Sequence, residues 1–244
     1  GTAILSTTNS NEANTKFLRA DGDGTCSWQI PSGVVRNATG TRNIAGPTTA
    51  GDALTGNAQD NTLYGYDAGT ALEDGDNNVA IGAYSLIGAV DSSQNTALGS
   101  NCMTGAVTGA DNVATGFFAL KDTTSGANNV AVGRSALQDH TDGDANIAIG
   151  RSALENMAAG DNNVAIGKDA GLNATNISKA ILIGYEAGKE LEDGTNIAIG
   201  DRALSIATGV AARSNIAIGY RAMTDIAGYS NIGIGGDCCD GGAT

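Results

Sequence analysis

The sequence has few of the large side chains that usually fill a globular core. Aromatic residues make up 4% of its 244 residues, with one Trp and three Phe, and only two residues are Pro. The chain must therefore bury many small apolar groups in a repeated way. Glycine is abundant, at 36 residues, but a hydrophobic share of 41% is too high for a disordered linker.

Positive charge and long apolar runs are also scarce. Thirteen Lys and Arg against 26 Asp and Glu give a formal net charge of −13. An acidic surface repels phosphate backbones, so we expect no nucleic-acid partner. No apolar run approaches the length of about 18 residues that a spanning helix needs, so we expect no membrane insertion. The chain opens on Gly1 without a signal-like region, and we expect it to be processed or cut from a longer protein.

A repeat of about 17 residues organises most of the chain. Its core is Asn, apolar, Ala, apolar, Gly, as in Asn78–Gly82 and Asn163–Gly167. The first seven intervals between the closing glycines are 17 residues, and the last three are 16, 19 and 16. These glycines are Gly65, Gly82, Gly99, Gly116, Gly133, Gly150, Gly167, Gly184, Gly200, Gly219 and Gly235. A fixed period of this kind is typical of a solenoid.

The alternation before each glycine predicts a short β-strand with two unlike faces. We expect the large apolar side chains to fill the interior of the coil. The small residue between them then lies on the other face, where it permits close approach of a neighbouring chain. The predicted contacts with neighbouring chains are therefore Ala80, Ala97, Ala114, Ala131, Ala148, Ala165, Ala198 and Ala217.

An Asn begins nearly every repeat, with Ala180 as the exception. Stacked about 4.8 Å apart, these amides can donate to and accept from one another as a ladder. The alternative is that Asn simply tolerates the turn before the strand. The predicted structural ladder is Asn78, Asn95, Asn112, Asn129, Asn146, Asn163, Asn196, Asn215 and Asn231, and Asn61 stands in the same column.

A second glycine, such as Gly126 or Gly143, recurs seven residues before the main one and marks a second turn. An Ala-Leu pair after the main glycine, as at Ala136-Leu137, supplies the opposing wall. The sequence therefore predicts an all-β fold, a parallel β-solenoid of about eleven coils. At about 4.8 Å per coil the rod would be roughly 50 Å long.

The cysteines and the histidine offer little for metal or redox chemistry. Cys102 and the pair Cys238-Cys239 occupy Ala-Leu positions, so we expect buried fillers. A redox or crosslinking role for the adjacent pair is the alternative. Without metal-ligand spacing we expect no metal and no cofactor, and we expect His140 to lie exposed in a loop.

Catalytic constellations are not evident in the sequence. Hydrolysis of a polysaccharide needs two placed carboxylates, whereas acids such as Asp76, Asp144 and Asp161 recur with the second turn. We therefore expect no catalytic residues and no enzyme, and a depolymerising tailspike is a remote alternative. Asp142-Gly143-Asp144 could hold Ca²⁺, but we expect solvated turn acids, because the nonapeptide calcium-roll signature is absent.

Two columns just after the main glycine are the candidate binding surface. Stacked aromatics beside cations can bind sugars or an acidic glycan. The alternative is that these rows close a subunit interface through ion pairs. Their members are Tyr66, Tyr84, Phe117, Phe118, Arg134, Arg151, Lys168, Tyr185, Arg202, Tyr220 and Arg221.

Over residues 59–239 the repeat resembles the YadA-like head of trimeric autotransporter adhesins. The resemblance implies a left-handed parallel β-roll and a homotrimer of rolls packed side by side. Residues 1–58 lack the repeat, and 240–244 form a short tail. Within the first segment, Thr15–Pro31 is similar to a segment common in bacteriophage tail fibres, with a turn at Asp21–Gly24, and 32–58 is a connector.

Together the two resemblances imply a structural and adhesive module of a phage tail fibre, located in the virion. Its expected partners are copies of itself, other virion tail proteins and a host surface glycan. The alternative is the head of a bacterial trimeric adhesin at the cell surface.

Overall fold

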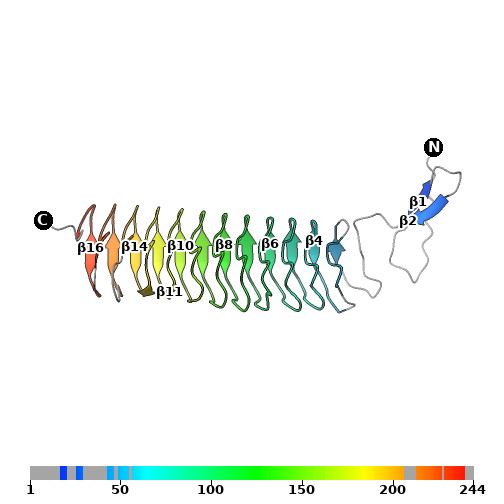
Figure 1. Ribbon diagram of the computed structural model, residues 1–244, viewed down its shortest axis with the longest axis horizontal. Helices are drawn as coiled ribbons and strands as arrows, with labels where there is room; N and C mark the ends of the chain where they lie inside the picture. The colour runs from blue at the N-terminus through cyan, green and yellow to red at the C-terminus, as the bar shows by residue number, and fades with distance from the viewer. Residues whose placement is uncertain are drawn as a thin grey trace.

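A single parallel sheet of twelve short strands forms the body of the protein. The computed structural model describes residues 17–20, 26–29, 43–46, 49–54, 57–205, 213–226 and 228–239. Each coil adds one strand, so the coils stack as successive rungs (Figure 1). The strands, in stacking order, are β3 (Ile44–Ala45), β4 (Thr62–Tyr64), β5 (Val79–Ile81), β6 (Thr96–Leu98), β7 (Val113–Thr115), β8 (Val130–Val132), β9 (Ile147–Ile149), β10 (Val164–Ile166), β12 (Ile181–Ile183), β14 (Ile197–Ile199), β15 (Ile216–Ile218) and β16 (Ile232–Ile234).

Equivalent residues meet in files that run along the roll. Val130 pairs with Ile147, and Ile147 with Val164. The register also survives the unequal intervals near the C-terminal end, since Ile197 pairs with Ile216 and Ile216 with Ile232. The predicted all-β parallel solenoid with coils of about 17 residues is confirmed, and the described residues contain no helix.

Two smaller strand pairs complete the described secondary structure. β1 (Phe17–Ala20) and β2 (Cys26–Gln29) form an antiparallel pair that matches the two extended runs expected there. The turn expected at Asp21–Gly24 between them, like the tail at 240–244, lies outside the described residues. β11 (Asn176–Ile177) and β13 (Asp193–Gly194) pair in parallel beside the main sheet.

The roll begins earlier than the sequence predicted. β3 lies within 32–58, the segment assigned to a connector, yet it pairs in parallel with β4. Asn43-Ile44-Ala45-Gly46 is a copy of the repeat that lacks one strand residue, which is why the five-residue pattern did not reveal it.

The assignment of the two strand faces was wrong. The central Ala of each strand points into the coil and is fully buried, while its apolar neighbours lie on the outer surface. Ala148, for example, is 0% exposed, whereas Ile147 and Ile149 are 37% and 38% exposed. The predicted trimer-contact residues are interior and cannot touch a neighbouring chain: Ala80, Ala97, Ala114, Ala131, Ala148, Ala165, Ala198 and Ala217.

The narrow interior explains this choice of face. The Leu of the opposing wall, such as Leu137, is fully buried and fills the coil, which leaves room for only a methyl group from the strand. Where a strand carries Leu182 in place of Ala, the wall has Gly188 in place of Leu, and a Cβ there would lie 2.5 Å from the Leu182 side chain. In that coil the larger strand residue is thus accompanied by a smaller residue in the wall.

The main glycine is required by both conformation and space. Gly133 has φ of 139°, and a Cβ on it would lie 2.4 Å from the carbonyl oxygen of Gly150 in the next coil. Two and four residues after this glycine, even non-glycine residues such as Ser135 and Leu137 adopt left-handed φ of 57° and 49°. Their amides donate to the carbonyls of Phe117 and Ala153 in the neighbouring coils, which stabilises the corner.

Candidate functional site

The Asn column forms a buried hydrogen-bonded ladder. The Oδ1 of Asn129 accepts the backbone N–H of Asn146 at 2.9 Å, and its Nδ2 donates to the carbonyl of Gly143 at 2.8 Å. Each side chain therefore joins the strand start of the next coil to that coil's second turn. The members that are fully buried are Asn78, Asn95, Asn112, Asn129, Asn146, Asn163, Asn196 and Asn215, while Asn231 is half-buried.

The ladder extends beyond the residues predicted for it. Asn61 donates its backbone N–H to the Oδ1 of Asn43 at 2.9 Å, so the ladder includes the early coil at β3. At the one exception, Ala180 still donates its backbone N–H to the Oδ1 of Asn163 at 3.0 Å. The role of this column is structural.

The recurring acids of the second turn also bond to the backbone. Asp144 accepts the N–H of Ala127 at 2.8 Å, and Asp161 accepts that of Asp144 at 2.9 Å. Asp76 does the same for Gln59 at 2.7 Å. These carboxylates therefore link successive coils in addition to facing solvent. Among the residues that the structure describes, no group of three or more His, Cys, Asp or Glu could hold a metal ion.

His140 is buried, not exposed as the sequence predicted. Its ring lies inside the coil at 0% exposure, with Nδ1 3.1 Å from the carbonyl oxygen of Met157 and Nε2 2.9 Å from that of Gly143. His140 stands seven residues after the main glycine, a position that Met157 and Leu191 also fill with buried side chains. That column is the signal that could have placed it in the interior.

The cysteines differ in their surroundings. Cys102 is fully buried, as expected of a filler, and burial raises the pKa of its thiol to about 12. Cys238 packs partly against the core, whereas Cys239 is exposed. The filler prediction is therefore wrong for Cys239, because it lies on the last described coil and no described coil covers it.

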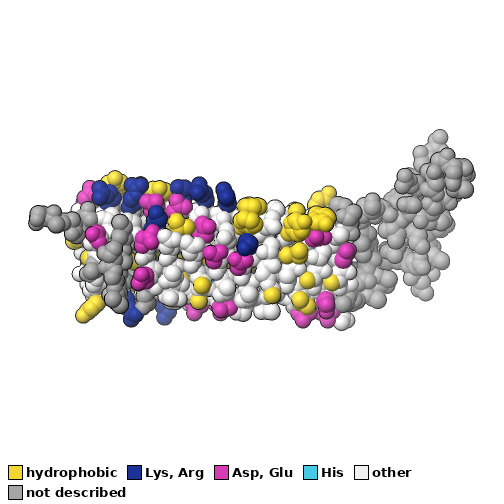
Figure 2. All heavy atoms as spheres, in the orientation of Figure 1, with side chains coloured by type: hydrophobic (Ala, Val, Ile, Leu, Met, Phe, Trp, Pro, Cys, Tyr) yellow, Lys and Arg dark blue, Asp and Glu magenta, His cyan; other side chains and the backbone are white. Residues whose placement is uncertain are grey.

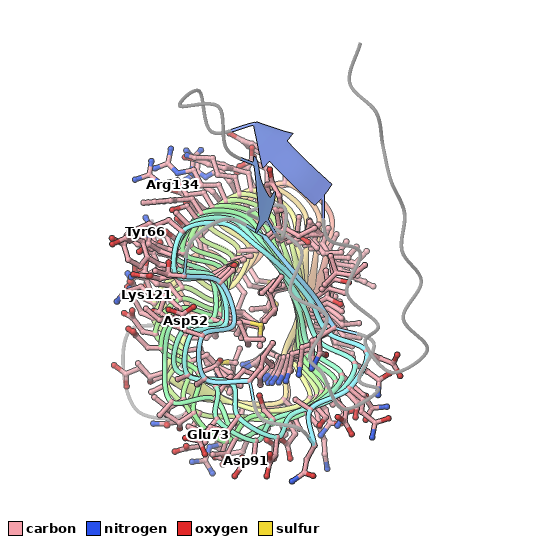
Figure 3. All side chains as sticks on the ribbon, turned by 90° about the vertical axis from the view of Figure 1, so that its right-hand side faces the viewer. Asp52, Tyr66, Glu73, Asp91, Lys121 and Arg134 are labelled. Carbon is pink, nitrogen blue, oxygen red and sulfur yellow. The ribbon has the colours of Figure 1, made fainter. Side chains whose placement is uncertain are left out.

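The candidate binding surface is a ridge along one edge of the rod. We call this set of residues the ridge: Tyr66, Tyr84, Phe117, Phe118, Arg134, Arg151, Lys168, Tyr185, Arg202, Tyr220 and Arg221. Figure 2 shows hydrophobic side chains along this edge over the N-terminal coils and Lys and Arg along the same edge over the C-terminal coils. Viewed along the roll, Arg134 and Tyr66 project from one side, and Glu73 and Asp91 from another (Figure 3).

Aromatic pairs make up the N-terminal part of the ridge. The rings of Tyr66 and Tyr84 meet edge to face with centroids 5.4 Å apart. Those of Phe117 and Phe118 are 3.8 Å apart, and the Nζ of Lys121 lies 5.7 Å from the Phe118 ring. Phe117 remains 41% exposed, so an apolar ring faces solvent here.

Charge pairs stabilise the C-terminal part. Lys168 and Arg202 lie 4.8 Å and 5.1 Å from the ring of Tyr185. Glu186 accepts hydrogen bonds from Arg202 at 2.9 Å and from Lys189 at 3.2 Å. Burial acts to raise the pKa of Glu186, but hydrogen bonds from three neighbouring side chains outweigh it and hold that pKa below its usual value. Farther along, the charged groups of Arg221 and Asp237 are 3.7 Å apart.

Comparison of the chain with protein-family models, curated proteins and solved structures found no match. No helix of the described residues is long and apolar enough to cross a membrane.

Proposed function

We propose that this chain is a non-enzymatic structural module of a fibre, a stiff rod that associates as a homotrimer and presents its side surfaces for attachment. The observation that carries the proposal is the outer face of the main sheet. That face is apolar along the length of the roll and has no covering element among the described residues.

The outer face carries two files of side chains, at the first and third positions of each three-residue strand. Every one of these side chains is Val, Ile, Leu, Thr or Tyr, from Thr62 and Tyr64 on β4 to Ile232 and Ile234 on β16. None is charged, although charged residues make up 16% of the chain. A large uncharged apolar surface of this kind is typical of a protein–protein interface.

A second copy of the same chain is the occupant that fits this face best. Equivalent side chains repeat at one coil spacing, so identical rolls can interdigitate their files over many coils without a change of register. This assigns the trimer contact to the outer Val and Ile files in place of the interior Ala column. Long, regular contact between parallel rolls would also make the rod stiff.

The mass of the protein in solution tests this proposal. We expect a trimer by light scattering, and we expect Ile149→Lys to give a monomer, because it places charge at the centre of the apolar face. Asn156→Lys is the matched control, since Asn156 is exposed and lies outside the strands. A monomeric wild type over the accessible concentration range, or a trimeric Ile149→Lys, would contradict the proposed interface.

We propose that the fibre to which this module belongs is a bacteriophage tail fibre, located in the virion, with other tail proteins as partners. The support is the likeness of Thr15–Pro31 to tail-fibre segments, and the two strands expected in this segment, β1 and β2, pair antiparallel. The head of a bacterial adhesin remains the alternative. Capsid and baseplate genes beside the coding sequence would favour the phage, and genes for a surface anchor would favour the adhesin.

A further inference from the structure

We propose that the stretch of the ridge formed by Phe117, Arg134, Arg151 and Lys168 binds an acidic polysaccharide whose chain lies along the rod axis. The inference names a ligand for the fibre module proposed above. It depends on how the coils stack and not on how many chains associate.

The three cations lie in one file. Arg134, Arg151 and Lys168 each follow the main glycine directly, in three successive coils. Their backbones are fixed in register, because the carbonyl oxygen of Arg134 accepts the N–H of Ser152 at 2.9 Å and that of Arg151 accepts the N–H of Asp169 at 2.9 Å. Stacked coils therefore bring the backbones of these three cationic residues to a spacing of about 4.8 Å.

Two of these charges are not compensated. The side chains of Arg134 and Arg151 are exposed, and their guanidinium groups have no hydrogen bond or ion pair with any residue that the structure describes. The other cations of the ridge have acidic partners: Lys168 pairs with Asp169 at 2.8 Å, Arg202 with Glu186 at 2.9 Å and Arg221 with Asp237 at 3.7 Å. A protein with a net charge of −13 thus keeps two neighbouring guanidinium groups free on one edge.

The repulsion within the file favours an anionic ligand. The hydrogen bond to Asp169 raises the pKa of Lys168, and Arg151 acts in the opposite direction, which places these two cations within electrostatic range. An anionic group near the file would relieve that repulsion. The planar guanidinium forks of Arg134 and Arg151 match carboxylate and sulfate oxygens in geometry.

The aromatic residue beside the cations distinguishes a sugar from a simple anion. Phe117 occupies the same file one coil before Arg134, and the Ser135 N–H donates to its carbonyl oxygen at 2.9 Å. Its partly exposed ring can receive the apolar face of a sugar. A polymer of acidic sugars supplies both a ring face for Phe117 and charges for the arginines, and its linear shape follows the file.

Calorimetric titration of the full chain with polygalacturonate, a carboxylated polysaccharide, tests this proposal. We expect binding that weakens with added salt. Arg151→Gln should weaken it roughly three- to tenfold, as expected for the loss of one exposed charge-assisted contact. Lys179→Gln is the matched control, because Lys179 is an exposed cation that precedes the strand and lies off the ridge. It should change the affinity by less than about twofold.

Three further titrants separate the components of the site. Chondroitin sulfate tests sulfate against carboxylate groups, neutral dextran should not bind, and polyglutamate presents carboxylates without sugar rings. Phe117→Ser should weaken polygalacturonate binding but leave any polyglutamate binding unchanged. Absence of binding to both acidic polysaccharides, equal losses in Arg151→Gln and Lys179→Gln, or polyglutamate binding as tight as that of the polysaccharides would each overturn the proposal. A monomeric protein that still bound polygalacturonate would refute the trimer alone.

Discussion

The Asn ladder can be tested by removing one member, Asn129, from the middle of the roll. Replacement by Ala deletes the Oδ1 that accepts the buried backbone N–H of Asn146 at 2.9 Å, and the Nδ2 that donates to the Gly143 carbonyl at 2.8 Å. The Gly143 oxygen keeps its contact with the Nε2 of His140 at 2.9 Å. The Asn146 N–H makes no other hydrogen bond with the described residues, so one buried donor is left unsatisfied.

The magnitude follows from these contacts. An unsatisfied buried N–H costs about 1–3 kcal/mol, and each lost hydrogen bond adds about 0.5–1.5 kcal/mol. We therefore expect Asn129→Ala to lower the free energy of unfolding by about 2–4 kcal/mol. Urea unfolding followed by circular dichroism, at one fixed protein concentration, measures this difference, because association makes stability depend on concentration.

Asn156→Ala provides the matched control. Asn156 is exposed and donates from Nδ2 to the Oδ1 of Asn173 at 2.6 Å, so the same substitution removes a hydrogen bond that water replaces. We expect a change of less than about 0.5 kcal/mol. A loss in Asn129→Ala no greater than the loss in Asn156→Ala would refute the conclusion that the buried ladder stabilises the roll.

Three other predictions concern the glycine, the interior and pH. Gly150→Ala combines a φ of 135° with a Cβ 2.4 Å from a carbonyl oxygen of the next coil, and should cost more than about 3 kcal/mol in the same unfolding assay. Gly236→Ala should be nearly neutral, because its Cβ would make only an ordinary contact, 3.8 Å from the carbonyl oxygen of Tyr220. Ala148→Phe should overpack the coil interior, lower the free energy of unfolding by at least about 1–3 kcal/mol and so lower the thermal midpoint. An unchanged midpoint would contradict the inward direction of the Ala column. The pKa of Glu186 is lower in the folded than in the unfolded state, so its pairing with Arg202 stabilises the roll at pH values above the usual pKa of a Glu. The stability advantage of wild type over Glu186→Gln should therefore disappear as the pH falls through the folded pKa of Glu186. Equal differences at neutral and acidic pH would rule this out.

Much of this architecture could be predicted from the sequence because coils lie directly above one another. A position in the repeat then becomes a file in space, so the period, the strands and the Asn column are visible as columns of letters. The ladder residues and the ridge could be named for the same reason. Even the compensation between Leu182 and Gly188 is present in the sequence as two departures from the pattern in one coil.

The tertiary structure decided which strand face is interior. Alternation with period two predicts two unlike faces, but it is symmetric with respect to inside and outside. The choice depends on volume across the coil, where Leu137 from the opposing wall leaves space only for Ala, and it directs the larger Ile149 outward. The lack of an ion-pair partner for the Arg134 guanidinium among the described residues is decided in the same way. It depends on side chains that meet between coils, and such contacts cannot be obtained from the order of residues along one coil.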